Sequence, residues 1–398
     1  MIDFHSCTRN LLVGEAERYS HPMRILLSPD KFAGTLTAQQ AADAMADGWR
    51  TRRPGDEIHT LPLADGGPGF LDAVLASRST ARVLTAPTSD PLGRPLTARF
   101  VMDGEVAYIE SAEAVGLHLL SAEDRDPARA TSFGLGLLIA AAVEAGARRV
   151  YVGLGGSAVN DAGAGMLVAL GYNLLDDRGF VVPYGAAPLA TVHSITGFGR
   201  MRGAQLIAAT DVDSPLTGPQ GATYFFGPQK GVVDDQLAIY EAALAHFSSV
   251  VQQHFSSSGP DLASRSGAGA AGGIGMGLFA LGAQRESGSE LVATATGLDQ
   301  AVANSDVVIT GEGSFDLQSL RGKVAAAVAG RARVHGVQCH VIAGQVAAEV
   351  SGDLVPRSEG VSAVWSLTEH FGSVDDACHN SITGLNALAA EVATQVTA

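Results

Sequence analysis

Short apolar runs alternate with polar, glycine-rich loops and with amphipathic stretches of helical length along most of the chain. The first run, residues 24–28, leads through a polar loop into a helical pattern that Thr37 and Gln40 open as a capping box. Alternation of buried strands with helices is typical of an α/β protein with a parallel sheet. Further strand-like runs lie at residues 57–61, 150–153, 205–210, 306–310, 340–343 and 361–367.

The pattern changes between residues 81 and 111, where short β-branched runs are interrupted at residues 90–93 and at Asp103-Gly104. The second break is a hairpin signal, so this part of the chain is predicted to be antiparallel. Hairpins within an α/β pattern indicate an inserted domain. We therefore expect one α/β domain from residues 23–70 and 286–398, an inserted α/β domain at 71–285, and a disordered tail at 1–22.

Composition and charge narrow the class of protein. The 398 residues are 46% hydrophobic, which is typical of a globular enzyme of two domains. A net charge of -15 argues against nucleic acid as a partner, because its phosphates would be repelled. The three cysteines are widely spaced and imply neither a disulfide framework nor a zinc site. We expect a cytoplasmic protein without a membrane partner, and the sequence leaves the oligomeric state open.

The segment VYVGLGGSAVNDAGAG, residues 150–165, is the predicted chemical centre. Its glycines let backbone N–H groups converge on one oxyanion, and the helix expected next adds a positive partial charge. Gly155, Gly156 and Ser157 are therefore candidates for binding phosphate. Asn160 and Asp161 are expected on the first turn of that helix, where they would hold a metal-bound phosphate or a substrate hydroxyl.

Two other interpretations fit the same segment. Gly153, Gly155 and Ala158 match the dinucleotide-binding fingerprint G-x-G-x-x-G/A, and Asp176 follows at about the distance of a ribose-binding acid. That match predicts a nicotinamide-dependent oxidoreductase. Alternatively, the glycines only allow a strand and a helix to pack closely.

Acids, lysines and glycines recur directly after the predicted strands. Open α/β sheets bind ligands at the carboxyl ends of their strands, so these residues are candidates for holding substrate and phosphate. Glu110, which ends the hairpin region, is a further candidate. The others are Asp30, Lys31, Asp65, Gly66, Gly67, Asp211, Lys230, Gly311, Glu312, Gly313, Asp316 and Lys323.

The types of charged residue at these positions suit phosphate chemistry. Only three of the 26 Lys and Arg residues are lysines, and all three, Lys31, Lys230 and Lys323, are expected in loops. A lysine supplies the compact, mobile ammonium that a phosphate clamp needs. Asp211 and Asp213 at a strand end suit Mg²⁺, which prefers one or two protein carboxylates together with phosphate oxygens and water. The chain has no Walker A spacing, so its phosphate site is expected to be of another kind.

Read together, these motifs resemble those of the bacterial type-1 glycerate kinase family over residues 23–398. The resemblance implies a discontinuous Rossmann-like or flavodoxin-like domain, a second α/β domain, and a cleft between them. It also implies Mg²⁺-assisted transfer of the ATP γ-phosphate to D-glycerate, with 2-phosphoglycerate favoured as the product. The segments that carry it are SPDKFAGTLTA, LADGGPGF, SDPLGRP, GLGGSAVNDAGAGM, DVDSPLTGPQGA, FGPQKG, GAGAAGGIG and TGEGSFDLQSLRGK.

The resemblance also implies roles for the candidate residues. The glycine loops, with Ser157 and Asn160, would bind phosphate or substrate oxygens, and Glu312 belongs to the same group. Asp211 and Asp316 would bind Mg²⁺. The catalytic candidates, which orient the acceptor hydroxyl or neutralise phosphate and carboxylate, are Asp30, Lys31, Asp65, Asp161, Lys230 and Lys323.

The chain departs from the family pattern at a few positions. Ala33 stands where family members usually carry Lys or Arg, and Pro68 and Phe70 replace a carboxylate and a hydroxyl. Val159 and Ala162 replace a usual Thr and Gly. Two alternatives follow: a catalytically weak relative that binds a nucleotide or an organic acid, or a kinase for a different small hydroxy acid.

Overall fold

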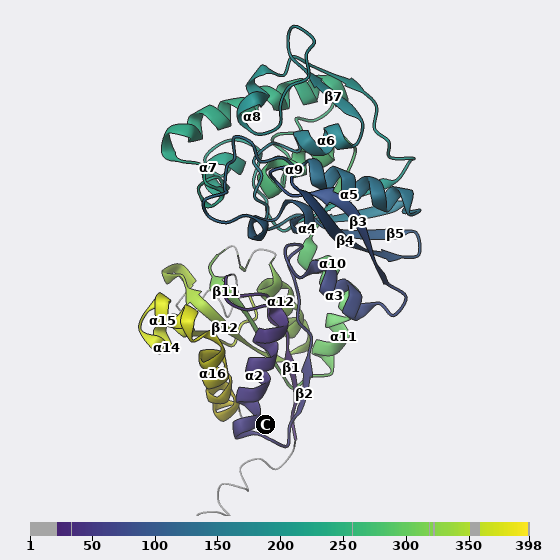
Figure 1. Ribbon diagram of the computed structural model, residues 1–398. Coiled ribbons are helices and arrows are strands. Elements are labelled where there is room, and N and C mark those ends of the chain that lie inside the picture. The colour runs from purple at the N-terminus through teal and green to yellow at the C-terminus, as the bar shows by residue number, and fades with distance from the viewer. Residues whose placement is uncertain are drawn as a thin grey trace, which may run out of the picture. The chain divides into compact units, whose positions relative to one another are not determined.

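The computed structural model describes residues 22–32, 34–256, 258–317, 319–320, 323–350 and 359–396 (Figure 1). The expected tail, up to residue 21, and Ala33 lie outside these residues. The chain divides into two compact units: Met1–Leu63 joins Gly297–Ala398 in the first, and Ala64–Thr296 forms the second. The predicted fold class, an α/β protein with a discontinuous parallel-sheet domain and an inserted mixed domain, is confirmed.

The junctions between the units lie at Leu63–Ala64 and Thr296–Gly297, which differ from the expected junctions near residues 70 and 286. The cause is packing within the second unit. Helix α3 (Phe70–Ser77) packs against α10 (Gly288–Thr296), and β10 (Gln284–Glu286) joins the sheet of that unit. Residues 64–70 and 286–296 therefore belong to the insertion rather than to the first unit.

The first unit is built on a sheet of five parallel strands in the order β13-β12-β11-β1-β2. Numbered by their order in this unit, the strands run 2-1-3-4-5, which is the order of flavodoxin-like folds. The two halves of the unit meet in register, with Ile25 opposite Val307. The strands are β1 (Arg24–Leu27), β2 (Glu57–Thr60), β11 (Val307–Phe315), β12 (Gln338–Val346) and β13 (Ala363–Ser366).

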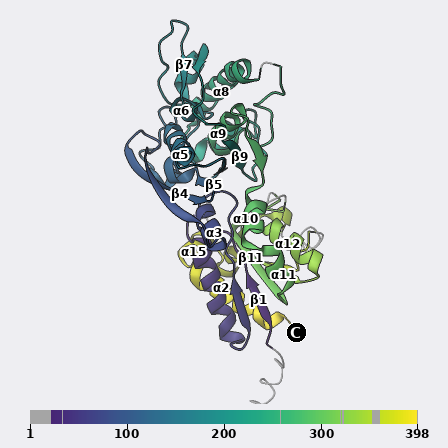
Figure 2. The ribbon, with the colours of Figure 1, turned by 90° about the vertical axis from the view of Figure 1, so that its right-hand side faces the viewer.

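Helices cover both faces of this sheet. Helices α2 (Ala38–Arg52) and α16 (Ser381–Gln395) pack together on one face, and α12 (Val324–His335) packs on β11 and β12 from the other (Figure 2). The predicted capping box of α2 is confirmed, because Thr37 and Gln40 exchange hydrogen bonds of 3.2 and 3.0 Å. The described part of this unit also contains α11 (Leu298–Ala303), α14 (Leu367–Phe371) and α15 (Val374–His379).

A buried ion pair lies between α2 and β2. The side chains of Arg53 and Asp56 are only 2% and 4% exposed, and the Arg53 guanidinium donates to the Asp56 carboxylate. Asp56 also accepts the backbone N–H of Met23 at 3.0 Å and the indole N–H of Trp49 at 2.9 Å. One carboxylate therefore ties the start of β1 to the end of α2.

The second unit is built on a mixed sheet in the order β10-β9-β6-β5-β4-β3. From β10 to β5 neighbouring strands are parallel, whereas β4 pairs antiparallel with both β3 and β5. The hairpins predicted between residues 81 and 111 are therefore confirmed. The strands are β3 (Arg82–Ser89), β4 (Pro95–Asp103), β5 (Val106–Glu110), β6 (Arg149–Gly153) and β9 (Gln205–Ala209), with a separate antiparallel pair of β7 (Tyr172–Leu175) and β8 (Ser194–Gly197).

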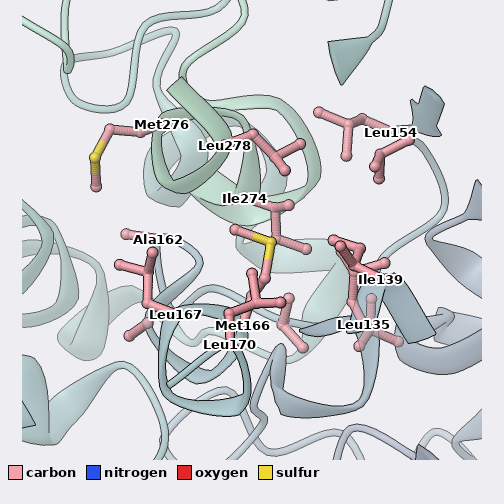
Figure 3. Packing of buried hydrophobic residues seen from close by; sticks show 14 of the residues in the cluster. Leu135, Ile139, Leu154, Ala162, Met166, Leu167, Leu170, Ile274, Met276 and Leu278 are labelled. Carbon is pink, nitrogen blue, oxygen red and sulfur yellow. The ribbon is translucent and has the colours of Figure 1, made fainter. Parts of the chain in front are cut away.

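Three helices of the second unit pack together in its core, which the strands of the sheet and α8 also enter (Figure 3). Leu135 and Ile139 from α5 contact the apolar cluster that Met166 of α6 and Ile274 of α9 also enter. Helix α9 is kinked at Ala271, Gly272 and Gly273, all with positive φ. Besides α3 and α10, the second unit contains α4 (Ala112–Val115), α5 (Phe133–Glu144), α6 (Ala164–Ala169), α7 (Ala222–Phe226), α8 (Asp234–Phe255) and α9 (Ala270–Ala280).

A helix long and apolar enough to span a membrane is not found in the described part of the chain.

Candidate active site

The first unit has a topological switch point between β1 and β11. From β1 the chain runs through α2 to β2 on one side, and from β11 it runs through α12 to β12 on the other. The loops that leave two such strands diverge, and open α/β sheets bind ligands in the crevice that this creates at the carboxyl ends. Any site of the first unit is therefore expected beyond Leu27 and along the end of β11.

The predicted residues of this unit gather at that point. The backbone N–H of Asp30 donates to the carbonyl of Gly311 at 2.8 Å, and Lys31 Nζ lies 3.6 Å from Asp30 Oδ1. Lys323 Nζ lies 3.9 Å from Glu312 Oε2. Asp30 and Glu312 are buried, whereas both lysines are partly exposed. The structure thus brings two acids and two lysines to the ends of β1 and β11, and their catalytic and binding roles stay predictions.

Two of the predicted positions in this unit have local structural tasks. A methyl group at Gly311 would collide with the carbonyl of Ile342, so the close pairing of β11 with β12 needs a glycine there. Asp316 Oδ1 accepts the backbone N–H of Ser319 at 3.0 Å, which closes a turn after β11. A metal role for Asp316 stays a prediction.

In the second unit, loop 64–69 lies across the carboxyl ends of β6 and β9. A methyl group at Gly155 would lie 2.6 Å from Gly67 Cα, and one at Gly66 would lie 2.8 Å from the carbonyl oxygen of Ala209. Gly66 and Gly156 also have φ values of +91° and +65°. These glycines therefore allow loop 64–69 to pack against the backbone at the ends of β6 and β9, whereas the packing interpretation expected close contact between a strand and a helix. Phosphate binding by Gly66, Gly67, Gly155 and Gly156 stays a prediction.

The carboxylate of Asp211 follows β9 beside this loop. Asp211 Oδ1 accepts the Ser287 hydroxyl at 2.6 Å, and Asp211 Oδ2 accepts the Ser289 backbone N–H at 2.9 Å. Burial raises the pKa of Asp211 to about 6, and the nearby charge of Asp65 acts in the same direction. Asp65 in turn accepts the N–H of Gly67 at 3.1 Å.

Asp213, the second acid expected to suit Mg²⁺ at this strand end, has other partners, and its metal role stays a prediction. Asp213 is largely exposed, lies 2.8 Å from an Arg285 guanidinium nitrogen and accepts the Ser266 hydroxyl. Asp65, distant in sequence, is the acid whose charge acts on Asp211. The orienting serines at 287 and 289 were missed, although Ser-Gly-Ser directly after a short strand is the kind of signal that strand-end reasoning uses.

Asn160 and Asp161 do not lie on a helical turn, which corrects the sequence prediction, because α6 begins only at Ala164. Asp161 is fully buried, and its Oδ2 accepts the Ser132 N–H at 2.7 Å, the Ser132 hydroxyl at 2.8 Å and the Gly165 N–H at 3.1 Å. Asp161 Oδ1 accepts the Gly163 N–H at 3.2 Å. The carboxylate therefore joins the starts of α5 and α6, and its catalytic role stays a prediction.

Lys230 lies in the interior of the second unit. Its Nζ donates to the carbonyl of Val159 at 2.7 Å and to the Ser157 hydroxyl at 3.3 Å, and a methyl group at Gly272 would lie 2.8 Å from it. Burial lowers the pKa of Lys230 to about 7, against the opposing effect of Asp161. Asn160, also buried, donates to Thr223 at 3.1 Å. The structure thus brings Ser157 and Lys230 together between the central loop and the kinked start of α9.

This burial gives the protein a specific dependence on pH. Between about pH 7 and 10.5 the unfolded chain keeps a proton on Lys230 that the folded chain has lost, so the free energy of unfolding rises with pH. We expect the free energy of unfolding of Lys230→Met to lack this rise with pH. It should also differ from wild type by a constant amount, because the Val159 carbonyl loses the ammonium that donates to it. Denaturant titrations of both proteins at pH 6.5, 8 and 9.5 measure the difference, and parallel pH profiles would contradict a buried neutral amine.

The dinucleotide interpretation is wrong. That fingerprint opens a helix directly after its strand, but residues 154–163 form a loop between β6 and the six-residue α6. Asp176 accepts the backbone N–H groups of Arg178 and Phe180 in a turn after β7, which pairs antiparallel with β8. Asp176 therefore does not follow a second parallel strand.

Comparisons with known proteins agree with this architecture. The family model described as the glycerate kinase family matches residues 25–397. A glycerate kinase from Bacillus subtilis (strain 168) is 38% identical over 94% of this chain and 98% of its own length. A glycerate 2-kinase from Escherichia coli (strain K12) is also 38% identical, over 89% and 93%. The crystal structure of a putative glycerate kinase 2 from Salmonella typhimurium LT2 superimposes with a TM-score of 0.72 at 34% identity, covering 94% and 98% of the two chains.

The family match and the names of the relatives show that the chain is an enzyme of the kinase class, whose members transfer phosphate. The match to the family model and the identities over nearly the full length show that the chain belongs to the glycerate kinase family.

Proposed function

We propose that the protein transfers the γ-phosphate of ATP to D-glycerate and that 2-phosphoglycerate is the product. The observation that carries the proposal is the similarity over nearly the whole chain to proteins named glycerate kinase and glycerate 2-kinase. The chemistry of the residues supports it. Phosphoryl transfer depends on positioning and on neutralising charge, which carboxylates, lysines and backbone amides supply.

Mg²⁺ is the metal that this proposal includes. The oxygens of Asp211 are oriented by Ser287 and Ser289, and Asp65 lies nearby, so the donors are the hard oxygens that Mg²⁺ prefers. Among the described residues, no three His, Cys, Asp or Glu side chains gather as a metal site. We propose that Asp211 and Asp65 hold the ion, which would neutralise charge on the phosphate oxygens.

The lysines of the first unit are further candidates for neutralising a phosphate or a carboxylate. Lys31 and Lys323, at the ends of β1 and β11, are partly exposed and lie at the switch point of their sheet. An ammonium at such a position attracts a phosphate or the carboxylate of a hydroxy acid. Asp30 and Glu312 lie beside these lysines and limit the positions that the two ammonium groups can take.

The test of the function is a measurement of ADP formation by the purified protein with ATP, Mg²⁺ and D-glycerate. L-glycerate, glycolate, lactate and glycerol serve as alternative acceptors. Adding enolase identifies the product, because 2-phosphoglycerate is its direct substrate and 3-phosphoglycerate is not. No glycerate-dependent ADP, together with thermal stabilisation by glycerate, would instead indicate a binding protein. Faster turnover of another acceptor would indicate a kinase for a different hydroxy acid.

The proposed metal role makes a separate prediction. We expect Ser287→Ala to raise the Mg²⁺ concentration needed for half-maximal activity about tenfold, because the carboxylate of Asp211 loses the hydroxyl that orients it. Asp211→Asn should have a larger effect. Ser248→Ala removes a hydroxyl that only donates to the Ala245 carbonyl on the exposed side of α8 and serves as the control. An unchanged Mg²⁺ requirement in Ser287→Ala would contradict the assignment.

A further inference from the structure

Glu110, at the end of β5, is buried in the second unit and has no role in the reaction as proposed above. It is 4% exposed and stands in register with Gly153 of β6, directly before the central loop. Transfer of a charged carboxylate from water into the protein interior costs several kcal/mol (~3 or more). The partners of Glu110 must therefore compensate this desolvation cost.

The partners of Glu110 belong to the loop that crosses the strand ends. Its Oε2 accepts the backbone N–H of Gly69 at 3.1 Å and that of Leu71 at 3.5 Å. Gly69 has a φ of +102°, so the chain makes a left-handed turn just where it enters α3. Glu110 therefore holds the end of loop 64–69 that leads into the helix.

The other end of the loop is held separately. Asp65 accepts the N–H of Gly67, and the backbones of Gly66 and Ala209 lie so close that only glycine fits. Loop 64–69 is thus held at its start and at Glu110, and its middle packs against Gly155. If the bond to Glu110 is lost, the end of the loop that leads into α3 loses the side chain that fixes it.

We propose that Glu110 is a positioning residue for phosphoryl transfer, because its carboxylate fixes loop 64–69 and with it Asp65, Gly66 and Gly67. This inference rests on the proposed function. A residue bound to backbone amides acts through the loop rather than on the substrate. Its effect should therefore depend on its ability to accept a hydrogen bond, which glutamine shares, and not on an ability to take up the proton of the acceptor hydroxyl.

The charged groups around Glu110 determine how its action depends on pH. Burial raises the pKa of Glu110 to about 7, and the charge of Glu113 in α4 adds to this. The amides of Leu71 and Gly69 and the charge of Arg99 oppose the rise. Arg99 itself lies 2.7 Å from both Glu113 and Asp72. Above about pH 7 the ionised carboxylate accepts strongly from both amides, and below it the neutral acid accepts weakly.

The experiment compares wild type, Glu110→Gln, Glu110→Ala and Glu113→Gln in two measurements. The first is kcat and KM for D-glycerate from pH 5.5 to 9. We expect Glu110→Ala to lower kcat/KM about 10- to 100-fold at pH 8, and Glu110→Gln to stay within about threefold of wild type. As the pH falls below about 7, kcat/KM of wild type should approach that of Glu110→Gln, because the protonated carboxyl then accepts about as weakly as the neutral amide. In Glu113→Gln this convergence should begin at lower pH.

The second measurement is hydrogen exchange of the amides at residues 66–71, which needs no activity. We expect exchange about tenfold faster or more in Glu110→Ala, and unchanged exchange in Glu113→Gln at pH 8. If wild type makes no ADP from glycerate, the proposed function fails while this measurement still shows whether Glu110 holds the loop. An inactive Glu110→Gln would overturn the inference in favour of proton transfer. Normal kcat/KM in a folded Glu110→Ala would overturn it in favour of a purely structural residue.

Discussion

Asp56→Ala is expected to lower the free energy of unfolding of the first unit by about 3 to 5 kcal/mol. The substitution removes the carboxylate that pairs with the buried Arg53 guanidinium, and it also removes the acceptor of the Met23 N–H and of the Trp49 indole N–H. The remaining donors cannot reach water without opening the junction between α2 and β2. Both tryptophans of the chain, Trp49 and Trp365, lie in the first unit, so their fluorescence follows the unfolding of that unit.

A second aspartate provides the matched control for this prediction. Asp306 pairs with Arg24 at 2.9 Å, but the two side chains are 40% and 52% exposed. Exposed ion pairs contribute about 1 kcal/mol or less, so Asp306→Ala should cost far less than Asp56→Ala. In the double variant Arg53→Met with Asp56→Ala, the cost should fall again, because the buried positive charge is removed together with the carboxylate that pairs with it. Equal midpoints of urea unfolding for Asp56→Ala and Asp306→Ala would contradict the larger contribution assigned to the buried Arg53–Asp56 pair.

Gly155→Ala is expected to lower kcat/KM for D-glycerate about 100-fold while the protein stays folded. The added methyl group would lie 2.6 Å from Gly67 Cα, so the backbone of loop 64–69 must move. A displacement of about 1 Å of groups that position a substrate can cost that factor. The displaced loop carries Asp65, whose charge acts on Asp211, so the Mg²⁺ requirement should rise in the same variant.

The control is the same substitution at a glycine with free space around it. Gly330 lies within α12, and a methyl group there has no neighbouring atom within 4 Å. Gly330→Ala should stabilise the protein by up to about 1 kcal/mol and leave turnover unchanged. Steady-state kinetics and thermal unfolding of both variants make the comparison. If Gly155→Ala retains full kcat/KM, the position of loop 64–69 does not matter for the reaction.

Local patterns in the sequence were sufficient to predict most of the framework. Runs of buried residues located the strands, the spacing of Thr37 and Gln40 marked the start of α2, and Asp103-Gly104 marked a hairpin. Each of these signals depends on residues within one element or on neighbouring strands. The short range of the signal explains why these predictions were confirmed.

The parts that could not be predicted depend on contacts between distant residues. Asp65 acts on Asp211, and Asp161 binds Ser132, yet no local pattern connects these pairs. The start of α6 was placed too early, because the backbone of the central loop is held by Lys230 and by the Asp161 carboxylate rather than by helical hydrogen bonds. Glu110 was identified from its place after a strand, but its partners at Gly69 and Leu71 required the structure.

The discontinuous sheet of the first unit has a consequence for biosynthesis. Ser28 and Thr310, which share a hydrogen bond between β1 and β11, are 282 residues apart. A ribosome that adds 5 to 20 residues per second makes the early strands wait roughly 15 to 60 s for this partner. The inserted unit is complete before then, so β1 and β2 must be kept from aggregation while they have no neighbour on the β11 side. Slowing translation between residues 63 and 307 should therefore reduce the yield of folded protein more than slowing it later.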